Sequence, residues 1–123
     1  MLRGADLDLN VVRHHPASFL ERARAFLERA EAENNMMLGL ATSLEAGTLT
    51  LSATPILVTV EEGGEVVAAA LRTPPHNLLI TRASDGAIAG LIAALRAQGV
   101  ALPGVMGPAG DAERFAAAWG GER

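Results

Sequence analysis

The stretch from Val66 to Arg82, VVAAALRTPPHNLLITR, constrains the fold more than any other part of the chain. It contains two apolar runs, a Thr-Pro-Pro-His-Asn segment between them, and a helical pattern directly after them. Proline has no N–H to donate to a sheet ladder, so a strand that begins at Val66 must end near Thr73. Leu78 to Thr81 then forms a second short strand. The sequence predicts two neighbouring strands joined by a stiff turn that contains His76.

A third strand comes just before this stretch and completes a meander. Ile56 to Val60 is rich in β-branched residues, and Glu61 to Glu65 contains two glycines that suit a tight turn. We therefore expect a hairpin with the strand from Val66 to Arg72. Two further short strands are predicted, one from Leu7 to Arg13 and one within Val100 to Met106.

Four helices are predicted around these strands. Pro16 opens the first helix, because a proline lacks only an N–H that a first turn does not use. Asn34 or Asn35 can cap a second helix that fades at Gly47, with Met36–Met37 as core filling. The apolar positions of the first helix are Phe19, Leu20, Ala23, Phe26, Leu27 and Ala30.

The remaining two helices lie in the last third of the chain. Ser84 or Asp85 can cap the third, and Gly99 follows it as a left-handed terminating residue. Pro108 opens the fourth, which Gly120–Gly121 ends. The element order is β-α-α-β-β-β-α-β-α, and 123 residues of which 50% are apolar can bury one core. The fold class is α/β (α+β), as a single domain over residues 1–123.

This element order resembles that of GNAT-type N-acetyltransferases. The segments FLERARAFLERAEAENNMMLGL, GGEVVAAALRTPPHNLLI and LPGVMGPAGDAERFAAAW resemble the N-terminal, degenerate domain of bacterial two-domain GNAT proteins, over nearly all of residues 11–119. The resemblance implies a mixed, mostly antiparallel sheet flanked by helices. It also implies a second, C-terminal half that binds acetyl-CoA and a first half that does not.

The GNAT cofactor signature is Arg or Gln, two residues, Gly, one residue, then Gly or Ala, placed between the fourth strand and the next helix. Arg82, Gly86 and Ala87 are the candidates for this role here. The glycine comes one position late, and Asp85 stands where phosphates would approach, so both departures oppose pyrophosphate binding. Ser84 and Asp85 then serve as a helix cap. We expect no cofactor for this chain alone.

A full GNAT sheet would have two more strands after Trp119, and the chain ends at Arg123. The short strand near Val105 would then lie at an exposed sheet edge, which is a template for pairing with another chain. We expect this edge to be covered by a C-terminal acetyltransferase domain or by self-association as a homodimer.

Few side chains could perform acetyl transfer. Tyrosine and cysteine are absent, and the histidines are His14, His15 and His76. His76 is the candidate catalytic residue, because Pro74–Pro75 stiffens its loop and Asn77 could orient it; the alternative is a turn histidine that bonds only to backbone. His14 and His15 are interpreted as a solvated loop pair, and no metal site is predicted.

Charge and hydropathy remove other classes of function. A net charge of −4 and 3% aromatic residues argue against nucleic-acid binding. No apolar run approaches the roughly 18 residues that span a bilayer, so we expect a cytoplasmic protein without a membrane partner.

Three functions stay open. The first is a non-catalytic GNAT-like domain that supports an acetyl-CoA-dependent half. The second is a small oligomeric acetyltransferase that binds acetyl-CoA itself, and the third is a ligand-free oligomeric interaction module.

Overall fold

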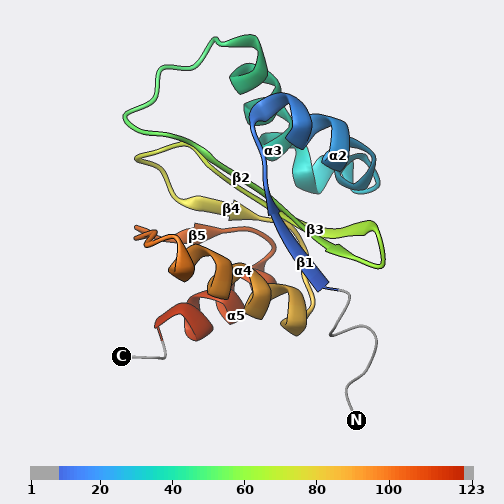
Figure 1. Ribbon diagram of the computed structural model, residues 1–123, viewed down its shortest axis with the longest axis vertical. Coiled ribbons are helices and arrows are strands. Elements are labelled where there is room, and N and C mark those ends of the chain that lie inside the picture. The colour runs from blue at the N-terminus through green and yellow to red at the C-terminus, as the bar shows by residue number, and fades with distance from the viewer. Residues whose placement is uncertain (1–8, 121–123) are drawn as a thin grey trace.

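A computed structural model describes residues 9–120, which form an α+β fold around one five-stranded sheet (Figure 1). The strand order is β1-β2-β3-β4-β5; neighbouring strands are antiparallel except β4 and β5, which are parallel. The predicted element order is confirmed. The strands are β1 (Leu9–Arg13), β2 (Ile56–Glu62), β3 (Glu65–Arg72), β4 (Leu78–Ile80) and β5 (Val105–Met106). The predicted start of β1 at Leu7 lies outside the described residues.

Helices cover both faces of the sheet (Figure 1). On one face lie α2 (Pro16–Glu28) and α3 (Glu31–Ala46); on the other lie α4 (Asp85–Ala97) and α5 (Ala109–Gly120). Side chains along a strand alternate between the faces, so Leu57 of β2 packs on α2 and α3 while Val58 packs on the opposite cluster. The sheet therefore has a hydrophobic core on each side.

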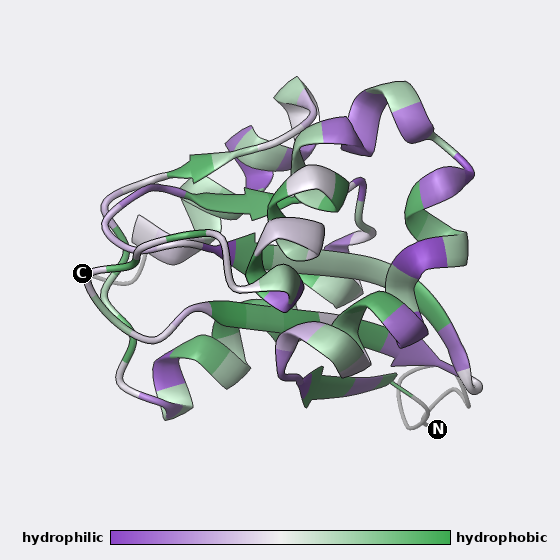
Figure 2. Cartoon of the chain, turned by 90° about the horizontal axis from the view of Figure 1, so that it is seen from above, coloured by the Kyte–Doolittle hydropathy of each residue, from purple (hydrophilic) through white to green (hydrophobic). Residues whose placement is uncertain are grey.

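The colouring by hydropathy shows the same division. The strands are largely green, whereas the helices carry purple bands among green ones, as amphipathic helices do (Figure 2).

Within residues 9–120, no helix combines the length and the apolar character that crossing a membrane would require.

The β2–β3 hairpin differs from its prediction in the length of its turn. Gly63 and Gly64 alone form the turn, with φ angles of 59° and 85° that favour glycine. Glu61 and Glu62 belong to β2, and the register shifts between Val60 and Glu61. The shift leaves Val67 of β3 without a partner in β2, as a β-bulge does.

The second helix begins earlier than predicted. The helical stretch is interrupted at Arg29–Ala30, between α2 and α3. Asn34 lies buried inside α3 rather than at its N-cap. The Asn34 side-chain amide donates to the Leu27 carbonyl at 3.1 Å, so it satisfies a C-terminal carbonyl of α2. The interpretation of Met36–Met37 as core filling is half wrong, because Met37 is buried and Met36 is 59% exposed.

Two glycines allow a test of how closely the chain after β5 approaches β4. A Cβ on Gly107 would lie 2.7 Å from the Ile80 carbonyl oxygen, whereas a Cβ on Gly39, inside α3, would meet nothing within 4 Å. We expect Gly107→Ala to lower the free energy of unfolding by about 1–3 kcal/mol through overpacking. Gly39→Ala should raise it by about 0.5–1 kcal/mol, since alanine loses less backbone entropy in a helix. Urea denaturation of both variants measures the contrast, and equal effects would contradict it.

Candidate functional site

The candidate cofactor residues lie in the loop between β4 and α4 and in the first turn of α4. Ser84 caps α4, and its hydroxyl oxygen accepts a hydrogen bond from the Ala87 N–H at 3.1 Å. Of the two predicted caps, the structure selects Ser84. Asp85 follows as the first helical residue, where a negative charge complements the helix dipole.

Two charged side chains of α5, Asp111 and Arg114, contact this loop. Asp111 is 8% exposed, and its carboxylate accepts a hydrogen bond from the Ala83 N–H at 3.1 Å. The Arg114 guanidinium donates to the Ala83 carbonyl at 2.8 Å and to Asp85 at 2.6 Å, and it also pairs with Asp111. The loop at the start of α4 is thus already occupied by carboxylates of the chain itself.

The three cofactor candidates, Arg82 in the loop and Gly86 and Ala87 in the first turn of α4, have different surroundings. Arg82 forms an ion pair at 2.8 Å with Glu33 of α3, and Gly86 is exposed. Ala87 is buried, with its N–H taken by the Ser84 cap. Asp111 comes from the distant helix α5 and was missed by sequence reasoning, because no local pattern shows which loop the start of α5 will meet.

His76 lies at the other end of β4, in a turn that contains a cis Pro74–Pro75 peptide bond. The His76 N–H donates to the Thr73 carbonyl at 2.9 Å, and the Arg72 guanidinium donates to the His76 carbonyl at 2.8 Å. The predicted partner Asn77 packs instead against Gly104, where an added Cβ would lie 3.0 Å from the Asn77 side-chain oxygen. The backbone of the turn is thus anchored, and the imidazole is exposed.

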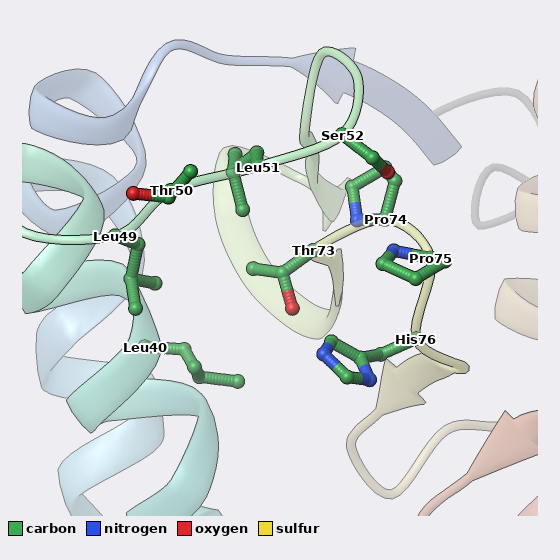
Figure 3. A pocket seen from close by; sticks show the side chains of 9 residues that line it. All are labelled: Leu40, Leu49, Thr50, Leu51, Ser52, Thr73, Pro74, Pro75 and His76. Carbon is green, nitrogen blue, oxygen red and sulfur yellow. The ribbon is translucent and has the colours of Figure 1, made fainter.

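The His76 imidazole borders a hollow of about 390 Å³ (Figure 3). Two further hollows, of about 290 and 220 Å³, continue from it along α3 and the β4–β5 edge. The large apolar side chains that stand exposed in residues 9–120 are Met36, Leu49 and Met106, and all three line these hollows. The exposed apolar surface is thus gathered in one groove beside His76.

The interpretation of His14 and His15 as a solvated pair is wrong for His14. Its Nε2 lies 2.8 Å from the Thr59 hydroxyl and its Nδ1 lies 3.2 Å from the Ser18 hydroxyl, while Thr59 in turn donates to Glu61. Glu61 also accepts two hydrogen bonds from the Arg22 guanidinium. This chain of contacts ties the end of β1 and the start of α2 to β2.

The same contacts shift two pKa values. Burial lowers the pKa of His14 below its usual 6.5, against the opposing pull of Glu61. The hydrogen bonds from Arg22 lower the pKa of Glu61 below 4.5. His15 has a different task, because its Nδ1 accepts from the Ser18 N–H at 3.4 Å and caps α2.

Comparison with protein-family models, with curated protein sequences and with solved structures finds no match to this chain. Over residues 9–120, no three side chains of the kinds that bind metal ions lie together.

Removal of the Asp111 carboxylate tests the closure of the loop. We expect Asp111→Ala to lower the free energy of unfolding by about 1–3 kcal/mol, because the buried Ala83 N–H loses its acceptor. The matched control is Glu113→Ala, an exposed acidic residue in the same helix, which should change it by less than about 0.5 kcal/mol. Urea denaturation measures both, and similar losses would contradict the assigned role.

The lowered pKa of His14 predicts a pH dependence of stability. The folded chain binds the His14 proton less readily than the unfolded chain, so stability falls as pH drops below 6.5. The Glu61 contribution, by contrast, is lost only as pH falls below 4.5. Chemical denaturation of His14→Gln across this range should show a smaller slope between pH 6.5 and 4.5 and an unchanged drop below it. A slope equal to that of the original chain would refute this assignment.

Proposed function

We propose that this chain is a GNAT-like, non-catalytic domain that supports an acetyl-CoA-dependent N-acetyltransferase half. The element order β-α-α-β-β-β-α-β-α and the mostly antiparallel sheet with helices on both faces support the proposal, since both are what the resemblance implies. The chain itself holds no cofactor in this proposal; acetyl-CoA belongs to the partner half.

The observation that carries the proposal is the Asp111 carboxylate bound to the Ala83 N–H, with Asp85 and Arg114 beside it. A pyrophosphate is an anion, and a helix N-terminus binds it through free N–H groups and a positive potential. Here one N–H donor already has a carboxylate acceptor. A second carboxylate stands in the first turn, where it would repel an incoming phosphate.

The side chains near the groove support the same proposal. Acetyl transfer to an amine needs a base and an acid placed around the reacting atoms. His76 has neither a carboxylate nor a tyrosine beside it in its hollow, and it lies at the opposite end of β4 from Arg82. The cofactor loop and the one catalytic candidate thus do not converge.

The interaction module is the second candidate function, and the edge strand favours it. β5 is the last strand of the sheet, and its Met106 is 46% exposed. An edge strand with an exposed apolar side chain can pair with another chain. A C-terminal acetyltransferase domain or a second copy of this chain would serve equally as that partner, and the first would combine both candidate functions.

Calorimetric titration with acetyl-CoA tests the proposal. We expect no binding heat from the unaltered chain at cofactor concentrations up to about 1 mM. At that concentration even a binding free energy of about −4 kcal/mol, which corresponds to a Kd of about 1 mM, would be detected. The Asp85→Asn/Asp111→Asn variant removes both negative charges while keeping similar side-chain shapes. Weak binding by that variant alone would identify the carboxylates as the obstacle.

Micromolar binding by the unaltered chain would overturn the proposal and favour the small acetyltransferase. Sedimentation of the same samples measures self-association. A domain that supports a separate catalytic half does not need to self-associate.

A further inference from the structure

The hollow beside His76 is built from three separate parts of the chain (Figure 3). Leu40 comes from α3, residues 49–52 from the connection between α3 and β2, and residues 73–76 from the turn between β3 and β4. Its volume of about 390 Å³ falls within the roughly 300–1,000 Å³ of small-molecule pockets. The hollow is therefore large enough for a small-molecule ligand.

Thr73 supplies a hydroxyl group to the wall of the hollow. The residue is 5% exposed, and its hydroxyl oxygen is directed into the hollow, between Leu40 and His76 (Figure 3). Among residues 9–120, no side chain or backbone group forms a hydrogen bond with this hydroxyl. No buried side-chain nitrogen or oxygen of residues 9–120 lacks a hydrogen-bond partner, so this unbonded hydroxyl is reached by solvent from the hollow. The Thr73 hydroxyl is thus a hydrogen-bonding group held ready at the wall of the hollow.

The polar end of the hollow suits a hydrogen-bond acceptor. The His76 imidazole lies beside Thr73 (Figure 3), and the Arg72 guanidinium, which does not line the hollow, donates to the His76 carbonyl. Neither this hollow nor the adjoining one of about 290 Å³ is lined by a carboxylate. A hydroxyl, an imidazole and a nearby guanidinium favour an anionic head group over a cationic one.

The rest of the surface suits an apolar chain. Leu40, Leu49 and Leu51 form the wall opposite the proline turn. The adjoining hollow shares Leu40, Thr73 and His76 with the first and extends to Met36 and Met106. These two methionines are 59% and 46% exposed, and flexible thioether side chains adapt to apolar ligands. A ligand that reaches from one hollow to the other is elongated and apolar away from its head.

We propose that this pair of hollows binds a small amphipathic carboxylate, with its carboxylate at Thr73 and His76 and its alkyl chain along Leu40 towards Met36 and Met106. The binding is non-covalent. It does not depend on the GNAT-like function, because the hollow lies at the other end of β4 from the α4 loop.

Octanoate is the probe, and its binding to the full 123-residue chain is measured by two-dimensional NMR. We expect saturable shifts at residues 40, 49, 51, 73 and 76, and much smaller shifts with octylamine at equal concentration. Thr73→Val, which replaces the hydroxyl with a methyl group, should weaken octanoate binding about tenfold, the usual effect of losing a hydrogen bond to a charged group. The matched control is Thr54→Val, an exposed threonine of the same connection that does not line the hollow, and it should leave the affinity unchanged.

Four results would overturn the proposal: no saturable shifts with octanoate, octylamine binding as tightly as octanoate, shifts spread over other surfaces, or unchanged affinity in Thr73→Val. If Thr73→Val does not fold, Thr73→Ser and His76→Phe take its place. The serine variant should keep binding through its hydroxyl, while the phenylalanine variant should weaken it several-fold. Failure to bind octanoate would leave the acetyl-CoA titration unaffected, so the two proposals fail separately.

Discussion

The pairing of β2 with β3 is the interaction on which the rest of the structure depends. Val58, Thr59 and Val60 lie opposite Ala70, Ala69 and Ala68, and all six residues are at most 2% exposed. Both faces of this hairpin are covered, because α2 and α3 pack on one side and α4 and α5 on the other. The alanines of β3 leave room for helices on each side, so larger side chains there would push the layers apart.

Electrostatics at the start of α4 then set what the fold can bind. Asp111 and Arg114 come from α5, yet they satisfy the backbone of the loop that precedes α4. A helix start with internal partners stabilises the packing of α4 against α5 and is less available to an external anion. The same closure that holds the last helix in place thus argues against cofactor binding. Arg82, the remaining cation of the loop, is turned towards Glu33 of α3.

Local patterns predicted the elements well, whereas contacts between distant elements stayed hidden. Pro16, Ser84 and Gly99 mark helix ends through their own backbone chemistry, so they were predictable. Asn34 was misread as a cap, because its real partner is a carbonyl of the previous helix. His14 and Asp111 likewise owe their surroundings to Thr59 and Ala83, which approach only after the sheet and helices have packed. The family resemblance stays a prediction.

The two ends of β4 differ in whether their polar groups have hydrogen-bond partners within the protein. At the Ile80 end, the Ala83 N–H donates to the Asp111 carboxylate and the Arg114 guanidinium donates to the Ala83 carbonyl. At the Leu78 end, the turn satisfies its backbone through Thr73 and Arg72 but leaves the Thr73 hydroxyl and the His76 imidazole at the wall of a hollow. A paired site resists ligands because binding must first break bonds within the protein, whereas the Thr73 hydroxyl faces solvent and only exchanges water for a ligand acceptor. Recognition by this chain is therefore favoured at the proline turn rather than at the helix start.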